Sequence, residues 1–430
     1  MFTPLKLITS HGQTIWVEPT PASPHSCRPL SLLLGKETDE TLKFYYKQLS
    51  SERKSIKESP LHVTVNEHKY KIKVKLEFSM IDGKMRAILS GLGGAFCMLC
   101  TCSREEAKDL TLSFSINRSS NEITEIWNKL SSGEILKKPH DHQVRQGVTQ
   151  EPLVPWDDIA ILSPLHSLLR FFDFLLKIVY HLNAVVFNWS NEEKTLGNQF
   201  RFLKKSKETV RAQLKEHTHL AIDIPDSTGK GGTSTTGNVI HAMLGSEANL
   251  AVLVNQVPER YRDSIHDLCS RAYAICKLYN SSQDIDVDKF KKFCADTKEI
   301  ILSQFKRPGS STQWIYLTPT VHGVLEHAHE LIKANGNKGL GDMTESGLEC
   351  NNKVLRLIRI SLSRKTSQVE NLSDCLERMW VKSDLEVRRA VPEKRHNSRD
   401  KYFDVKHTFE GALPYKSLCD YYLSELVSKK

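Results

Sequence analysis

The chain has 430 residues, which is long enough for two or three domains, each with its own hydrophobic core. A chain of this length does not need disulfides or metal ions in order to fold. Its 60 Lys and Arg residues against 51 Asp and Glu residues give a formal net charge of +9, a modest bias that permits contact with nucleic acid without requiring it. Ten scattered cysteines and the lack of a secretory signal after Met1 argue against a secreted disulfide framework and indicate a reducing compartment.

The first hundred residues show the pattern of a small α/β unit. Two β-rich runs within residues 5–18 flank a His-Gly-Gln turn and predict a hairpin, and Thr38 is placed to cap a helix. Residues 69–80 alternate strictly between apolar and mostly basic side chains, which predicts a half-buried strand with one basic face. Asp82 follows in an Asp-Gly pair, for which the simplest interpretation is a turn.

From about residue 104 to residue 318 the periodicity is mainly helical. The most apolar stretch, residues 163–187, carries Arg170, Asp173 and Lys177 at positions that would lie in hydrocarbon if the segment crossed a membrane. We therefore predict an amphipathic core helix there and no membrane span.

Two pairs of residues have the spacing of zinc ligands. Cys97 and Cys100 lie in the sequence FCMLC, and no second cysteine pair follows nearby. His322 and His327 are separated by four residues, within the range seen in Cys₂His₂ sites. Either pair alone is weak evidence, because a histidine pair on a helix usually lies at the surface. Together they predict one shared tetrahedral Zn²⁺, with His329 as the alternative ligand.

Such a zinc ion would bring the segment after the histidines back toward Asp82. That segment holds Glu345 and Glu349, and Glu349 shares a helical face with Lys353 and Arg356. A carboxylate at a strand end and another on a helix are hard oxygen ligands for Mg²⁺ or Mn²⁺ and can support two-metal phosphoryl transfer. The neighbouring basic side chains suit a phosphate backbone, although a solvated helix face is the simpler interpretation of such residues.

Several motifs together resemble one family. FCMLC, VHGVLEH and ESGLECNNKVLRLIR, with PLHSLLRFFDFLLKIVYHLN and TSTTGNVIHAML between them, look like the catalytic core of the larger V(D)J recombination-activating protein and the related Transib transposases. The resemblance covers the chain from about residue 2 to at least residue 390. It implies an RNase H-like fold that a long helical, zinc-containing insertion interrupts, and three acidic residues that bind catalytic metals.

The resemblance assigns roles to particular residues. Zinc ligands are implied at Cys97, Cys100, His322 and His327. Asp82 matches the second catalytic acid and Glu349 the third, with Glu345 as the competitor if the alignment shifts. Contacts to DNA are expected from Lys353, Arg356 and Arg359. Double-stranded DNA, a second copy of the chain, a second recombinase subunit and a nuclear location are implied in the same way.

One departure from the family bears on activity. The family's first catalytic Asp ends a strand upstream of the hairpin with which this sequence starts, and its amino-terminal DNA-reading module has no counterpart here. We therefore expect the sequence to be either a fragment or a remnant that keeps the scaffold and lacks the chemistry, with little or no cleavage from the polypeptide as written. The alternative function is a catalytically dead zinc-binding DNA-binding or scaffold protein. A third hypothesis is a zinc-stabilised helical protein with no DNA role.

The predicted fold class is α+β, an incomplete RNase H-like sheet that lacks its first strand. We expect an RNase H-like first part at residues 1–103 and a helical insertion at residues 104–321. The zinc histidines and the helix that carries the catalytic acid follow at residues 322–390, and a basic linker with a short terminal helix occupies residues 391–430.

Overall fold

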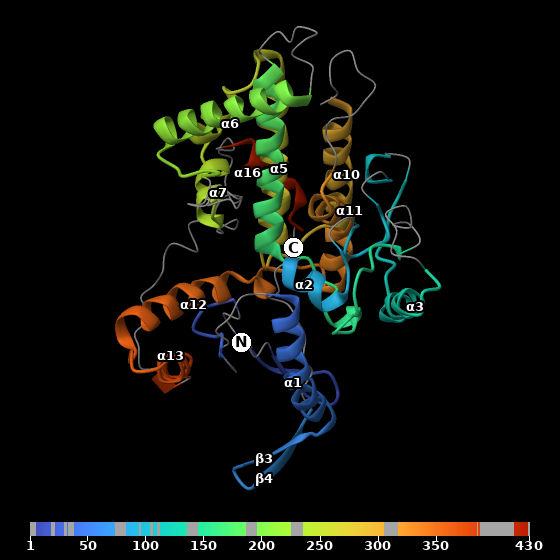
Figure 1. Ribbon diagram of the computed structural model, residues 1–430, viewed down its shortest axis with the longest axis vertical. Coiled ribbons are helices and arrows are strands. Elements are labelled where there is room, and N and C mark those ends of the chain that lie inside the picture. The colour runs from blue at the N-terminus through green and yellow to red at the C-terminus, as the bar shows by residue number, and fades with distance from the viewer. Residues whose placement is uncertain are drawn as a thin grey trace. The chain divides into compact units, whose positions relative to one another are not determined.

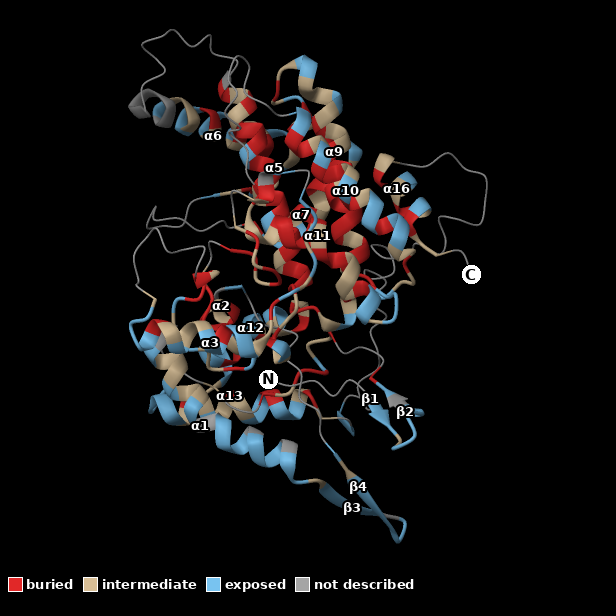
Figure 2. Ribbon diagram, turned by 90° about the vertical axis from the view of Figure 1, so that its right-hand side faces the viewer, coloured by how far each residue is buried: buried red, intermediate tan, exposed pale blue. Residues whose placement is uncertain are grey.

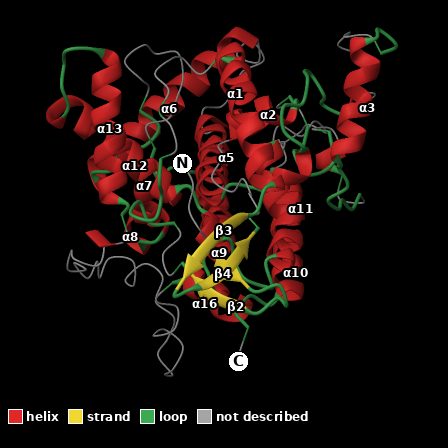
Figure 3. Cartoon of the chain, turned by 90° about the horizontal axis from the view of Figure 1, so that it is seen from below, coloured by secondary structure: helices red, strands yellow, loops and turns green. Residues whose placement is uncertain are grey.

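The computed structural model shows a mixed α and β chain that is mostly helical, as the sequence predicts (Figure 3). It describes residues 6–18, 22–29, 32, 38–73, 83–93, 96–103, 106–109, 112–135, 145–185, 196–224, 235–304, 317–384, 386–387 and 417–428. Strands within this part of the chain form two separate two-stranded sheets. Contacts group the chain into two compact units. The first unit comprises residues 1–96, 117–163 and 343–392, and the second comprises residues 97–116, 164–342 and 393–430. The four domain boundaries expected from the sequence remain predictions.

The first unit opens with the predicted hairpin. Strand β1 (Lys6–Ile8) pairs antiparallel with β2 (Thr14–Val17). Gly12 lies in the connecting turn with φ +83°, a left-handed conformation that glycine adopts without steric cost. The β-rich runs at residues 5–18 therefore form the hairpin that their pattern predicts.

A second hairpin pairs β3 (Leu61–Val65) with β4 (His68–Ile72). Apolar pairs such as Val63 and Tyr70 lie on one face and polar pairs such as His62 and Lys71 on the other. The expectation of a half-buried strand is wrong for the described part, because His68 to Lys71 are exposed and Tyr70 keeps 51% of its surface accessible. The described side chains of both strands are largely exposed, so this hairpin buries neither face. Residues 74–82, which include Asp82, lie outside the described residues.

Helices complete the first unit. They are α1 (Asp39–Glu58), α2 (Gly83–Ser90), α3 (Ser120–Ser131), α12 (Ser346–Leu357), the π-helical turn η7 (Ile358–Leu362) and α13 (Gln368–Lys382), with a short 3₁₀ turn η3 (Trp156–Asp158). Thr38 caps α1 as predicted, since its hydroxyl accepts the backbone N–H of Thr41. Leu89 of α2 packs with Val154 and Ile159, and these three residues form a small core in this unit.

The second unit is a helical assembly. Its helices are α5 (Pro164–Val185), α6 (Leu196–Thr218), α7 (Gly237–Leu244), α8 (Glu247–Val254), α9 (Arg262–Tyr279), α10 (Val287–Gln304), α11 (Pro319–Ala334) and α16 (Leu418–Leu426), with 3₁₀ turns η1 (Glu106–Lys108), η5 (Glu259–Tyr261) and η6 (Gly341–Met343). Helices α10 and α11 run side by side, and α11 also packs on α5 (Figure 1). Buried residues concentrate along α5, α9 and α11 (Figure 2). The helical pattern predicted between residues 104 and 318 is confirmed for the part of this range that the structure describes.

Helix α16 closes the second unit against α9 and α10. The hydroxyl of Tyr422 donates a hydrogen bond to the carboxylate of Asp267. The Arg271 guanidinium carbon lies 4.8 Å from the ring centroids of both Phe293 and Tyr422, and its Nε is 2.9 Å from Asp267 Oδ2. After the helix, the backbone N–H of Ser428 donates to the carbonyl of Asp284 at 3.1 Å. The short terminal helix that the sequence predicts is thus an integral part of this unit.

Among the described helices, none combines the length and the apolar character that a bilayer crossing requires. In the long helix α5, Arg170, Asp173 and Lys177 interrupt the apolar surface.

A partly buried histidine in the second unit should make stability depend on pH. The Nδ1 atom of His241 is 3.1 Å from the Tyr273 hydroxyl, and burial, with a smaller effect from Lys277, lowers the pKa of His241 to about 4. An unfolded histidine titrates near 6.5, so the unfolded chain binds more protons between these values, and stability is lost as pH falls from about 6.5 to 4.

We expect His241 to account for about 3 kcal/mol of the loss in unfolding free energy between pH 7 and pH 4. Urea denaturation of the wild type and of His241→Gln at both pH values measures this difference. An identical pH dependence in the two proteins would contradict the assignment.

Candidate metal centre and acidic helix

A tight turn presents the two cysteines of the FCMLC sequence. The backbone N–H of Cys97 donates to the carbonyl of Cys102 at 3.0 Å, which closes the turn. The N–H of Leu99 donates to Cys97 Sγ at 3.4 Å, a contact that favours the thiolate form. Cys97 and Cys100 keep only 2% and 0% of their surface accessible. Both sulfur atoms therefore face the protein interior.

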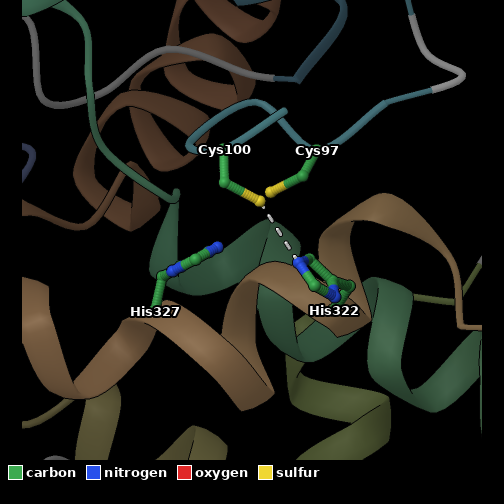
Figure 4. Close-up of side chains that lie close together, drawn as sticks. All are labelled: Cys97, Cys100, His322 and His327. Carbon is green, nitrogen blue, oxygen red and sulfur yellow. Dashed lines mark hydrogen bonds between the residues drawn. The ribbon is translucent and has the colours of Figure 1, made fainter. Parts of the chain in front are cut away.

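Helix α11 supplies the two histidines. Thr318 caps the helix by accepting the N–H of Val321, and Pro319 occupies the first turn, where its missing N–H costs nothing. His322 and His327 are 1% and 0% accessible, and their ring centroids lie 5.4 Å apart. Figure 4 shows both rings directed toward the sulfur atoms of the cysteine turn. The second unit alone contributes all four side chains.

The four side chains form one buried cluster whose geometry can hold a metal ion. One ligand atom from each of Cys97, Cys100, His322 and His327 lies within 4.8 Å of the others. Cys100 Sγ is 3.4 Å from His322 Nε2 (Figure 4). Zinc bonds of about 2.3 Å to sulfur and about 2.0 Å to nitrogen, at tetrahedral angles, separate the two atom types by about 3.5 Å. Cys100 and His322 thus already have the spacing that a tetrahedral ion requires, and the other two ligand atoms lie within 4.8 Å of them.

His327 has the orientation of a metal ligand. Its Nδ1 is 3.0 Å from Glu330 Oε2, while its buried Nε2 makes no hydrogen bond to any residue in the described part of the chain. The same Glu330 oxygen accepts the N–H of Ile116 at 3.0 Å, so its position is fixed. A carboxylate on the outer nitrogen orients an imidazole and raises its basicity as a ligand. His329, the alternative ligand, is partly exposed and lies outside the cluster.

Two further residues hold the His322 ring, and the spacing of the ligand pairs predicts neither of them. Cys102 Sγ lies 3.9 Å from His322 Nδ1 and 3.2 Å from the carbonyl of Ser103. The ring of Phe114 meets His322 edge to face at a centroid distance of 5.1 Å. Cys102 lies two residues after Cys100 in the sequence, and this short spacing is the one feature of the sequence that indicates its position near the cluster. These contacts leave Nε2 as the nitrogen that faces the cluster.

Charge coupling inside the cluster also fits a cation. Burial raises the pKa of the Cys97 thiol and the nearby Cys100 raises it further, while His322 and His327 act in the opposite direction and favour the thiolate. Burial alone lowers the pKa of His322, but hydrogen bonds to Cys100 and Cys97 outweigh it and raise that pKa to about 9. Buried thiols and imidazoles therefore stabilise charge on one another. A divalent cation stabilises thiolates more strongly and takes the place of the protons.

In the other unit, α12 carries the candidate acids and is fixed along one face. A side chain at Gly347 would meet the carbonyl oxygen of Ala22 at 2.3 Å, so only glycine allows this approach. The amide of Asn351 donates to the carbonyl of Pro24 at 2.8 Å, and Ile358 is buried just after the helix. Successive residues on a helix are about 100° apart, so these three positions lie on one side.

The opposite side of α12 is exposed and bears Glu349, Lys353 and Arg356. Arg359, in the π-helical turn that follows, is exposed as well. Glu345 precedes the helix and is only 3% accessible. The shared face predicted for these charged residues is present. Because Asp82 lies outside the described residues, its approach to Glu349 remains a prediction.

Comparison with known proteins bears on these sites. Residues 2–95 match the family model described as the RNase H domain of recombination-activation protein 1 (RAG1). V(D)J recombination-activating protein 1 of Oncorhynchus mykiss is 23% identical over 381 residues, which cover 86% of this chain and 33% of that protein. The proteins of Sus scrofa and Oryctolagus cuniculus are 23% and 24% identical, and each alignment covers 88% of this chain and 36% of the relative.

The chain therefore spans about a third of the length of the curated relatives that it matches. The family-model match includes Asp82 and ends just before Cys97, while the longer alignments extend over most of the chain. The resemblance to the V(D)J recombination-activating protein family, which the sequence motifs indicate, is thereby confirmed.

Proposed function

We propose that this chain is the core of a DNA recombinase of the V(D)J recombination-activating type, which nicks and joins DNA by divalent-metal-dependent phosphoryl transfer. The observation that carries the proposal is the exposed face of α12. It presents the carboxylate of Glu349 beside the positive charges of Lys353 and Arg356, in a chain that matches the RNase H domain model over residues 2–95.

Asp82 and Glu349 are the proposed holders of Mg²⁺ or Mn²⁺. The exposure of Glu349 supports its choice over Glu345, whose burial at 3% accessibility keeps it from a large substrate. Bound cations would supply Lewis-acid stabilisation of the reacting phosphate oxygens. The proposed reaction is a nick by water, followed by attack of the freed 3′ hydroxyl on the opposite strand. Lys353, Arg356 and Arg359 would hold the phosphates on either side of the reacting one.

Zn²⁺ is the ion proposed for the cluster of Cys97, Cys100, His322 and His327. Two thiolates and two imidazoles are a common structural zinc set, and four protein ligands leave no position for water or substrate. Complete burial of all four side chains supports a structural role. In this proposal the ion fixes the cysteine turn to α11 and takes no part in the chemistry.

The partners follow from the same proposal. Double-stranded DNA is the proposed substrate, in the nucleus, because the relatives are named for their part in V(D)J recombination. We further propose that the chain acts as a homodimer with a second recombinase subunit, as the family resemblance implies. The rival proposal is a catalytically dead DNA-binding scaffold. This rival is favoured because only two residues of this sequence, Asp82 and Glu349, are matched to the three catalytic acids that the family resemblance implies.

A nicking assay distinguishes the two functions. The purified chain is incubated with supercoiled plasmid and Mn²⁺, and binding of a short duplex is followed by fluorescence anisotropy. Chelator-sensitive conversion to open circles supports the recombinase proposal. Binding without nicking supports the scaffold, and absence of both would leave the zinc-stabilised helical protein without a DNA role.

The basic residues of α12 should dominate binding. We expect Lys353→Gln/Arg356→Gln to weaken duplex binding and to reduce the slope of log K against log salt by about 2, since each phosphate contact contributes about 0.9. Anisotropy titrations between low and moderate salt measure the slope. Lys47→Gln/Lys54→Gln removes two exposed charges from α1 in the same unit and is the matched control. Equal slopes for the two double variants would rule out a DNA contact at α12.

A further inference from the structure

The charged residues that interrupt the apolar surface of α5 line a cavity in the helical unit. Its volume is about 460 Å³, the size of a small-ligand site. Helices α5 and α6, the segment after α6 and the start of α11 contribute its lining, which comprises Arg170, Asp173, Phe174, Leu176, Lys177, Tyr180, Lys207, Asp223, Thr318 and Thr320. The nuclease chemistry proposed above uses none of these residues.

Arginine side chains neutralise both carboxylates of this cavity. Arg170 Nη1 lies 3.2 Å from Asp173 Oδ2. Asp223 accepts hydrogen bonds from Arg211 Nε at 3.1 Å and from the Tyr180 hydroxyl at 3.0 Å. Carboxylates paired in this way offer little to a metal cation, so a cation site is not what the cavity provides.

Two ammonium groups of the cavity belong to neither of these pairs, although Lys177 is close enough for its charge to favour the ionised form of Asp173. Neither Lys177 nor Lys207 forms an ion pair with any residue that the structure describes, although both line the cavity. Lys207 Nζ lies 5.7 Å from the ring centroid of Tyr180, a cation–π contact that places this ammonium against the cavity wall. After the arginine–aspartate pairs cancel, the cavity has an excess of two positive charges.

The first turn of α11 forms part of the cavity rim. Thr318 and Thr320 line the cavity at this end, and each carries a hydroxyl group that can donate a hydrogen bond. The amino-terminal turn of this 16-residue helix adds a partial positive charge, although Pro319 has no N–H group and the N–H of Val321 is already bound by the Thr318 hydroxyl. Two lysines, two hydroxyls and a helix start that converge on one cavity match the oxygen atoms of a phosphate group.

We propose that this cavity binds a phosphate group, either of a nucleic-acid backbone or of a free phosphorylated compound. Lys177 and Lys207 provide the charge, and Thr318 and Thr320 provide hydrogen bonds. The site lies in the second unit, and its existence does not depend on the nuclease proposal, which concerns the first unit.

Two ligands test the site in the full chain. Inorganic pyrophosphate is titrated by calorimetry, and a short DNA duplex is titrated by fluorescence anisotropy. We expect Lys177→Gln/Lys207→Gln to weaken at least one of them by about tenfold or more, because two charge-assisted contacts are lost. The control Lys204→Gln/Lys215→Gln removes the same charge from exposed positions of α6 that do not line the cavity, and it should change binding less than about twofold. Circular dichroism and thermal unfolding verify that both double variants fold.

The outcomes separate the sources of the phosphate. Selective weakening of pyrophosphate binding indicates a free phosphorylated ligand. Selective weakening of duplex binding, with no pyrophosphate bound by the wild type, indicates a nucleic-acid backbone phosphate. If the cavity variant and the surface control bind both ligands equally well or equally poorly, the cavity is not a phosphate site.

Discussion

The purified chain should contain one Zn²⁺ ion, and His327→Ala should lose it. Removing the ion leaves buried sulfur and nitrogen atoms without a partner, and each unsatisfied buried polar group costs about 1–3 kcal/mol. The free energy of unfolding should therefore fall by several kcal/mol in the variant, and in the wild type after treatment with a chelator. Elemental analysis measures the metal, and urea denaturation measures the stability.

Cys350→Ala is the matched control for this experiment. Cys350 is an exposed thiol of α12 outside the cluster, so its loss should change neither metal content nor stability. Full retention of zinc by His327→Ala would contradict the ligand assignment. If His327→Ala retained zinc and only a His329 variant lost it, His329 would be the ligand in place of His327.

The second large effect concerns the chemistry on α12. If the chain nicks DNA, Glu349→Gln should reduce the Mn²⁺-dependent rate by about a thousandfold, because a metal ligand contributes several kcal/mol of transition-state stabilisation. Glu349 is exposed, so the same substitution should leave folding unchanged. Single-turnover nicking of a labelled duplex measures the rate at saturating protein.

Two other acids serve as comparisons for Glu349. Glu377→Gln removes an exposed carboxylate of α13 in the same unit and should nick at the wild-type rate. Glu345→Gln alters a buried residue and should lower stability more than it lowers the rate per folded molecule. If the Glu345 variant folded but did not nick DNA, while the Glu349 variant remained active, Glu345 would be the metal ligand in place of Glu349.

Local signals in the sequence were sufficient to predict several elements. The β-rich runs around His11 and Gly12 form a hairpin, Thr38 caps a helix, and residues 418–426 are helical. Each of these depends on residues within a few positions of one another, where turn, cap and periodicity rules apply directly. The sequence also predicts that Cys97 and Cys100 lie close to His322 and His327, because each pair has the spacing of zinc ligands and one ion would bind both pairs.

Features that depend on tertiary contacts could not be predicted in this way. The alternation in residues 69–73 indicates a strand, but whether its face is buried depends on a covering layer that no local pattern specifies. Cys102 contacts the His322 ring from 220 positions away, and Ile116, 214 positions before Glu330, fixes the carboxylate that orients His327. The cavity lysines required the packing of α5, α6 and α11, since the sequence shows only that Lys177 interrupts an apolar helix.

The metal cluster has a consequence for the order of folding. Cys100 and His322 are 222 positions apart, so their contact closes a very long loop, and the entropy of that closure is lost before the ligands can be gathered. Contacts of such sequence separation slow folding and form late. We therefore expect chains synthesised under zinc starvation to accumulate with the helices formed and the cysteine turn undocked. The buried face of α11 would then be accessible to chaperones and proteases.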